Sequence, residues 1–498
     1  MNLDLRSSEW CNLLDLSPDN TVVVLGEPPA GAEEGLKRFF SSVTVYQDSK
    51  KPGILKLLSR ILPEGSGPVL ILVILDMPED SEELIEEMMN YSRLFADIIL
   101  FNKDTRVFNE LNKLFRFKEY AIVPSINDPR WILPLENRKL SVASLDLYQP
   151  SLAGAKLKKI ILRVLLNLGL SNLLPVSRFY HFYSKGREGD KRLKGRIKRH
   201  LGIDEIHLAL STGTPPVGRK VTAQVMNREG EILGYARISP NPDVYDLFQN
   251  EKDCLDYLNS IRIENFLVPK ALDLGELGKA RYLFQSIPSE KLDRGPADLE
   301  DIHINSLVEL FNKTSKPVKI EDSKVLNDIS ARLQLIKGNI EDSKLRLLNE
   351  GLESVKSKLI NETPRLGLVH GDFTPWNTRM CEGKLYIFDW EWVRRDAPPF
   401  QDLYHFDISR FVFVKHLTPN AIWEILQGRQ FQKLLQDYRG MTKVPQEVEN
   451  IALIWTLLDD ITWYLSGYIR EGLPVPETHE FIDVYFNLLI MAKILEPR

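Results

Sequence analysis

Cysteine is scarce in this chain, whose 498 residues include only Cys11, Cys254 and Cys381, with no Cys-x-x-Cys pair. Such scattered thiols predict neither a disulfide framework nor a cysteine zinc site, and they are typical of a cytoplasmic protein. The first residues carry early acids and no apolar core, so we expect no signal peptide. No apolar run approaches the roughly 20 residues that a transmembrane helix needs.

A strong charge imbalance is also missing. The formal net charge is −5, so we expect no wholesale binding of nucleic acid. The chain contains no His-Glu-x-x-His, Gly-x-Ser-x-Gly or P-loop Gly-Lys-Ser/Thr motif, which removes support for a zinc protease, a serine hydrolase or a P-loop enzyme. Its hydrophobic fraction of 43% and charged fraction of 27% are those of a globular protein, and the length predicts roughly three domains.

Residues 1–150 predict an α/β domain with a parallel, Rossmann-like sheet. Short β-branched runs alternate with helical patterns, as βαβ units do. The strands are expected at 21–25, 43–46, 69–75 and 98–101, and the helices at 32–40 and 78–94. The turn after the first strand, Gly26 to Gly31, faintly resembles that of a degenerate methyltransferase-like domain binding S-adenosylmethionine. Pro28 and Pro29 stand where the fingerprint needs glycines, so we favour a structural turn over a cofactor site.

Residues 151–200 predict a basic helical linker. From 156 to 199 the chain carries thirteen Lys/Arg against two acids. The helical pattern at 156–170 places apolar side chains on one stripe, namely Leu157, Ile160, Ile161, Val164, Leu165 and Leu168. We favour a solvated basic linker helix that is packed on its neighbours. The alternative is a peripheral contact of 156–199 with an anionic lipid, a nucleic acid or a phosphorylated ligand.

The residues that suggest chemistry lie in LGLVHGDFTPWNTRMCEGKLYIFDWE, from Leu366 to Glu391. One apolar run leads to His370-Gly371-Asp372, and a second leads to Asp389. Two acids and Asn377 would therefore meet at strand and loop ends around one cleft. Phosphoryl transfer needs such a set, because Mg²⁺ prefers oxygen ligands and a further oxygen must orient the attacking hydroxyl and accept its proton. In this geometry Asp372 is the base, and Asn377 and Asp389 are metal ligands.

HGDFTPWN followed by FDWE resembles the aminoglycoside phosphotransferase and choline kinase family, a branch of the protein-kinase-like fold, over roughly residues 200–498. The resemblance implies an N-lobe at 201–288, a mostly helical C-lobe at 289–498, and an ATP- and Mg²⁺-dependent kinase for a small-molecule hydroxyl. It makes Asp372 the catalytic aspartate and Asn377 and Asp389 the metal ligands. It leaves His370 and Asp402 as structural support for the catalytic loop.

The predicted N-lobe departs from the family pattern. Its phosphate loop, at 211–220, has only Gly213 and Gly218 as glycines. Arg237 stands where the family has a lysine, with Glu251 as its expected partner. Arginine still pairs with phosphate and carboxylate, but the exchange is not conservative at a positioned site. By analogy, the hinge around Gln285 and Ile287 would face the adenine.

Two functions therefore stay open. The first is a small-molecule kinase for a sugar, an amino alcohol or a similar acceptor. The second is a weak or inactive pseudokinase that serves as a nucleotide-linked scaffold, for example in polysaccharide assembly. Four C-terminal residues at helical spacing are candidates for contact with the acceptor, namely Trp455, Asp459, Asp460 and Trp463. A helix with an aromatic core face and exposed acids explains the same pattern, and we favour that interpretation.

Overall fold

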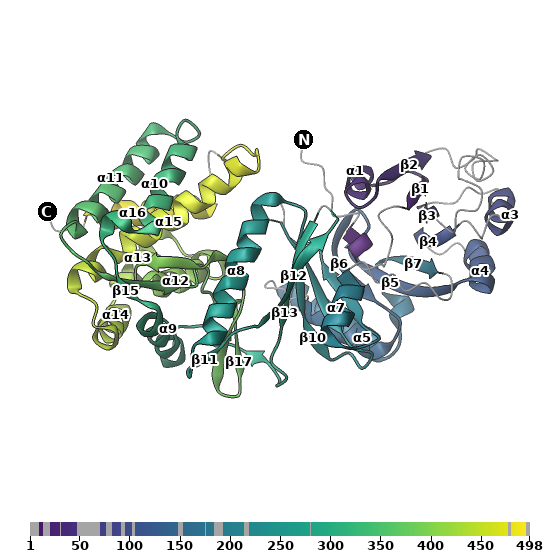
Figure 1. Cartoon of the computed structure of the whole chain (residues 1–498), viewed down its shortest axis with the longest axis horizontal. Coiled ribbons are helices and arrows are strands. Elements are labelled where there is room, and N and C mark those ends of the chain that lie inside the picture. Colours follow the sequence, from purple (N-terminus) through teal and green to yellow (C-terminus); the bar gives the residue numbers. More distant parts are fainter. Residues whose placement is uncertain are drawn as a thin grey trace. The chain divides into compact units, whose positions relative to one another are not determined.

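The structure is a computed structural model of the whole chain (Figure 1). It describes residues 9–12, 20–29, 31–46, 70–75, 82–90, 95–101, 105–147, 153–174, 176–183, 193–213, 219–278, 280–476 and 480–494. These residues group into two compact units. Unit 1 contains Met1–Pro242 and Leu272–Ile287, and unit 2 contains Asp243–Ala271 and Pro288–Arg498. No helix among the described ranges is both long enough and apolar enough to cross a membrane.

Unit 1 is built on one sheet of twelve strands with the order β12-β13-β10-β9-β8-β6-β5-β7-β4-β3-β1-β2. The strands are β1 Thr21–Leu25, β2 Ser42–Tyr46, β3 Leu70–Ile74, β4 Phe95–Phe101, β5 Arg116–Ser125, β6 Asp128–Pro134, β7 Ser177–Tyr183, β8 His207–Ser211, β9 Val221–Met226, β10 Ile232–Ser239, β12 Ala271–Leu277 and β13 Ala280–Ser286. The helices are α1 Ala32–Lys37, α3 Glu82–Asn90, α4 Thr105–Leu114, α5 Arg138–Ser144, α6 Ala153–Asn167 and α7 Leu193–Leu201, with short 3₁₀ turns η3 Leu145–Leu147 and η4 Ser171–Leu173.

The four strands predicted in residues 21–101 are present and form the parallel part of this sheet. Strands β1 and β2, β1 and β3, and β3 and β4 pair in parallel. The apolar side chains of β1, β3 and β4 are buried on both faces, which is why these segments are apolar runs without alternation. Strand β2, at the edge of the sheet, is only partly buried. The pairing explains the strand pattern at 21–101. The turn at Gly26 is tied to the neighbouring strand, because the Gly26 amide donates to the carbonyl of Tyr46 at 3.0 Å.

A separate N-terminal Rossmann-like domain is not confirmed, because the sheet continues without interruption. Strand β6 pairs with β8 through Trp131 opposite Ser211 and Ile132 opposite Leu210. The backbone amide of Thr212 also donates to the Arg130 carbonyl at 3.0 Å. One apolar cluster includes side chains from β1, β5, β6, β8, β9, β10 and β13. The strands expected in two domains therefore share one sheet and one core.

The segment 151–200 is not a purely helical linker. It begins with α6 and ends with α7, but β7 lies between them and inserts into the sheet between β4 and β5, antiparallel to both. Phe179 is completely buried there and stacks on Tyr120, with 4.8 Å between the ring centroids. The high positive charge of the segment favoured a linker interpretation, so this strand was not predicted. The sequence SRFYHFY nevertheless has the aromatic content that is typical of a buried strand.

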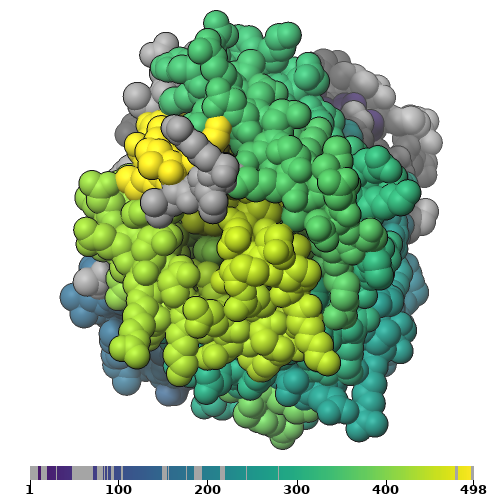
Figure 2. All heavy atoms as spheres, turned by 90° about the vertical axis from the view of Figure 1, so that its left-hand side faces the viewer, coloured from purple at the N-terminus to yellow at the C-terminus, as the bar shows by residue number. Residues whose placement is uncertain are grey.

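Unit 2 is mostly helical and has one large core. Its helices are α8 Pro242–Ser260, α9 Asp301–Thr314, α10 Lys324–Ile336, α11 Asp342–Leu359, α12 Gln401–Phe413, α13 Pro419–Gln427, α14 Arg429–Thr442, α15 Gln446–Arg470 and α16 Glu480–Ile494, with 3₁₀ turns η5 Ile320–Asp322 and η6 Trp390–Trp392. Its strands are β11 Phe266–Leu267, β14 Asp293–Arg294, β15 Lys316–Pro317, β16 Arg365–Val369, β17 Thr378–Cys381, β18 Lys384–Ile387 and β19 Arg394–Ala397. Figure 2 shows one face of this unit, where segments from the C-terminal part of the chain, coloured green to yellow, lie at the surface.

Two small sheets position the predicted catalytic segment inside unit 2. Strand β16 pairs antiparallel with β15 and β19, and β18 pairs with β17 and β11. His370 follows β16 directly, and Asp389 comes two residues after the end of β18. The strand ends therefore deliver both acidic motifs of the sequence, as expected from the apolar runs before them.

We expect Phe179→Ala to lower the free energy of unfolding by about 3–5 kcal/mol, because it empties a fully buried aromatic site in the sheet. Urea unfolding followed by circular dichroism measures the change. Leu157→Ala is the matched control, since that side chain is 59% exposed and its loss should change stability little. Equal small effects for both variants would show that β7 is not part of the core.

Candidate active site

The loop after β16 is held by a single buried carboxylate. Asp402, at the start of α12, accepts the backbone amide of His370 at 2.7 Å with Oδ2 and that of Gly371 at 3.0 Å with Oδ1. Only 3% of its surface is exposed. Gly371 has φ +81°, and a Cβ there would lie 2.2 Å from the Trp392 carbonyl oxygen, so only glycine fits. The predicted supporting residue thus fixes the direction in which Asp372 leaves the strand.

His370 links this loop to the second motif. Its Nδ1 accepts the backbone amide of Asp372 at 3.2 Å, and its Nε2 lies 3.0 Å from the carbonyl oxygen of Phe388. The first bond makes Nδ1 the acceptor, so Nε2 carries the proton and donates to Phe388. The ring is completely buried beside Trp390, at 4.6 Å between centroids. This placement is that of a structural anchor.

Asp372 and Asn377 form a direct pair. The amide nitrogen of Asn377 donates to Oδ2 of Asp372 at 2.8 Å and to its carbonyl oxygen at 2.9 Å. The backbone amide of Phe388 donates to the Asn377 carbonyl at 3.2 Å. Asn377 therefore lies between the catalytic-loop aspartate and the strand that leads to Asp389. Because its nitrogen is used toward Asp372, the amide oxygen is the atom suited to a cation.

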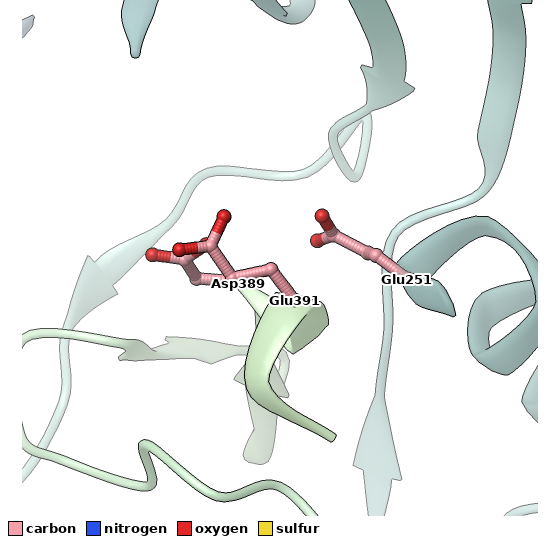
Figure 3. A group of neighbouring side chains, drawn as sticks. All are labelled: Glu251, Asp389 and Glu391. Atoms are coloured by element: carbon pink, nitrogen blue, oxygen red, sulfur yellow. The ribbon is translucent and has the colours of Figure 1, made fainter. Parts of the chain in front are cut away.

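Three carboxylates converge at the end of the second motif. Glu251 of α8, Asp389 and Glu391 each offer an oxygen, and these oxygens lie within 4.8 Å of one another. Figure 3 shows Glu251 pointing from its helix toward the other two side chains. Oε1 of Glu251 also accepts the Trp390 amide at 3.0 Å. Oxygen-only donors of this kind fit Mg²⁺, and the sequence had not assigned Glu391 to this group.

Asp389 has an unusual backbone conformation. Its φ of 70° and ψ of 53° lie in the left-handed region, which costs energy for a residue with a Cβ. Aspartate tolerates this region better than most residues. The conformation turns the chain sharply from β18 into η6, so that Asp389 and Glu391 can contribute to one cluster.

His405 is a member of the site that sequence reasoning missed. From α12, its Nε2 lies 3.2 Å from Oδ1 of Asp372, and its Nδ1 lies 3.1 Å from Oδ2 of Asp460 on α15. Burial acts to lower the pKa of His405, but Asp460 and Asp372 outweigh it and raise the pKa well above its ordinary value. The histidine is therefore an imidazolium that donates to both carboxylates. Its position three residues after Asp402, on one helix face, was the available signal.

Two of the four candidate acceptor-contact residues are in the interior. Trp455 is completely buried. Asp459 is 1% exposed and is ion-paired with Arg332 and with Arg394, the latter at 3.2 Å. Burial acts to raise the pKa of Asp459, but Arg394 and Arg332 lower it to about 2. These contacts brace α10, β19 and α15 and leave no surface for an acceptor, because a buried charge needs such partners.

The other two candidates have different surroundings. Asp460 binds His405 and so contacts Asp372 only through it. Trp463 packs edge-on against Trp392 at 4.4 Å between centroids and lies under the guanidinium of Arg394, 4.3 Å from the ring centroid. The aromatic face expected for α15 is thus used mainly inside the protein.

The predicted nucleotide residues are divided between the two units. Arg237 on β10, Gly213, Gln285 on β13 and Ile287 belong to unit 1, and Glu251 belongs to unit 2. Gly218 lies outside the described residues. Gly213 has φ +77°, and a Cβ there would lie 2.2 Å from the Lys220 carbonyl oxygen, so the two ends of this loop approach closely. A role of these residues in binding nucleotide stays a prediction.

Residues 235–443 match the model of the phosphotransferase enzyme family. The matched range contains His370, Asp372, Asn377 and all three residues of the acidic cluster. No curated protein matches the sequence. The family match confirms the resemblance inferred from HGDFTPWN and FDWE.

Several solved kinases are similar in structure to more than half of the chain. Choline kinase LicA from Streptococcus pneumoniae is 15% identical with a TM-score of 0.39, covering 60% of this chain and 96% of its own. ADP-bound aminoglycoside phosphotransferase APH(2'')-Ib is 13% identical with a TM-score of 0.36, covering 60% and 95%. A choline/ethanolamine kinase family protein from Mesorhizobium loti is 15% identical with a TM-score of 0.37, covering 57% and 87%.

His405→Gln tests the bridge between Asp372 and Asp460. Because the folded-state pKa of His405 is raised, the stability from its charge is complete below its unfolded pKa of about 6.5 and is lost as pH rises through the folded value. We therefore expect the variant to lose more stability at acidic pH than at alkaline pH. Urea unfolding of both proteins across this range gives the difference. A pH-independent difference would contradict a charged His405.

Proposed function

We propose that the chain transfers the γ-phosphate of ATP to a hydroxyl of a small molecule. The observation that carries this proposal is the hydrogen-bonded pair of Asp372 and Asn377, joined through His370 and Phe388 to the strand that leads to Asp389. The resemblance of HGDFTPWN and FDWE implies these residues for that reaction, and the matched range 235–443 contains all of them. The acceptor class we favour is a sugar or an amino alcohol.

Asp372 is the base of the proposed reaction. Its two oxygens accept hydrogen bonds from Asn377 and His405, which fix the carboxylate plane while each oxygen keeps a further lone pair. The acceptor hydroxyl gives its proton to Asp372 as its oxygen bonds to the γ-phosphorus. The bond from that phosphorus to the bridging oxygen of ADP breaks, and ADP leaves. Positioning of the hydroxyl is the main contribution of such a residue.

Asp389 and the amide oxygen of Asn377 would hold Mg²⁺, with Glu391 beside them. The ion neutralises charge on the triphosphate when it is bound. Arg237, which is buried on β10, remains the residue that we propose to contact the phosphates. The guanidinium of Arg237 keeps its charge at every physiological pH, which suits this role. It is larger and planar, whereas the ammonium group of lysine is compact.

Asp372→Asn and Asp389→Asn test the roles of the two acids. We expect each to lower kcat by roughly 10²–10⁴-fold, because one removes the base and the other a metal ligand. The readout is ADP release with ATP, Mg²⁺ and a panel of sugars and amino alcohols. Asp437→Asn, an exposed acid on α14, is the matched control and should keep full activity. Unchanged turnover in either site variant would refute the assignment.

Arg237→Lys separates this proposal from its alternative, a pseudokinase scaffold. If the wild type is an active kinase adapted to arginine, the exchange should lower kcat/KM by about tenfold or more, since the planar fork is replaced by a point charge. A large gain of activity would instead identify the wild type as impaired. A thermal shift with ATP and Mg²⁺ is measured in parallel, and ligand stabilisation without turnover on the panel would favour the scaffold.

A further inference from the structure

Helix α6 of unit 1 presents an apolar face to solvent. Five of its large aliphatic side chains are at least half exposed, namely Leu157 at 59%, Ile160 at 59%, Ile161 at 50%, Val164 at 50% and Leu168, just past the helix end, at 64%. Their spacing of three and four residues places them on one side of the helix. The sequence predicted a linker helix packed on its neighbours, and this stripe is not the side that packs.

The helix is nevertheless anchored. Leu162 and Leu166, on the opposite side, are each 3% exposed and belong to an apolar cluster with Leu140 of α5 and Leu145 of η3. The helix therefore has two apolar sides, and only the side with Leu162 and Leu166 packs against the rest of unit 1. The other side is exposed, and Leu173 of η4, which is 65% exposed, extends it by one turn.

Positive charge surrounds the stripe. Lys156 and Lys158 are exposed and flank it on the helix, and Arg163 pairs with Asp146 at 2.8 Å. No Asp or Glu occurs between Asp146 and Glu188, so no acid interrupts this basic, apolar surface along the chain. An apolar stripe between lysines is suited to a partner that offers both an apolar interior and a negative surface.

We infer that α6 docks on an anionic membrane surface, with the stripe (Leu157, Ile160, Ile161, Val164 and Leu168) in the lipid boundary and its axis in the membrane plane. Aliphatic side chains would be buried among acyl chains while Lys156 and Lys158 reach the headgroup phosphates. A second copy of the chain fits less well, because a two-fold contact would bring the same lysines together. Nucleic acid would meet the lysines but leave the aliphatic side chains exposed.

Vesicle co-sedimentation of the full chain tests this inference. We expect binding to vesicles of phosphatidylcholine mixed with phosphatidylglycerol, weaker binding at high salt, and little binding to phosphatidylcholine alone. The triple variant Leu157→Gln/Ile161→Gln/Leu168→Gln should weaken the partition by about tenfold or more, since binding scales with the apolar area that is buried. Lys156→Gln/Lys158→Gln should remove most of the preference for anionic lipid.

The matched control makes the same chemical change elsewhere. Leu335, Ile360 and Ile494 of unit 2 are 40%, 69% and 75% exposed, and their replacement by Gln should leave vesicle binding unchanged. All variants change exposed side chains, so urea unfolding should match the wild type.

Three results would overturn the inference. One is absence of wild-type binding to anionic vesicles, and another is unchanged binding of the α6 triple variant. The third is a wild-type protein that does not bind vesicles and is a dimer by light scattering, while the triple variant is a monomer. That result would identify a second copy of the chain as the partner of the stripe.

Discussion

The candidate site depends on one buried carboxylate. Asp402 accepts two consecutive backbone amides, those of His370 and Gly371, at the point where β16 ends. Without a partner these donors would be buried and unsatisfied, which costs roughly 1–3 kcal/mol each. The same bonds set the left-handed turn at Gly371, and that turn aims Asp372 toward Asn377 and His405. Burial raises the pKa of Asp402, while the hydrogen bonds from the backbone amides of His370 and Gly371 act to lower it.

Two neighbouring acids on α15, Asp459 and Asp460, have different partners. Asp459 is enclosed by arginines, with its pKa lowered to about 2, and acts as an internal brace between helices. Its sequence neighbour Asp460 faces His405 and through it the catalytic loop. Two adjacent residues on α15 thus have separate roles because the helix points them to different neighbours, one to the arginines and one to the histidine.

The sequence predicted much of this arrangement because its signals were local. Apolar runs that end in His370-Gly371-Asp372 and in Asp389 predicted both strand ends and their side chains, and the family match confirmed the resemblance. Glu391 was missed because its approach to Glu251 of α8 depends on the fold. The spacing of His405 from Asp402 places both on one face of α12, but it does not show that Asp372 and Asp460 lie beside the histidine. The exposure of the apolar stripe of α6 was not predicted, since periodicity shows that a helix has an apolar face but not what covers it.

The junction of β6 and β8 gives unit 1 a further property. If the chain were cut before Ile203 to isolate the kinase-like part, β8 would lose the partner that pairs with Ser211 and Leu210. Its free backbone amides and carbonyls would then form an open sheet edge, beside an apolar cluster that has lost more than half of its buried members. Such an edge pairs readily with strands of other molecules, and in the intact chain β6 covers it.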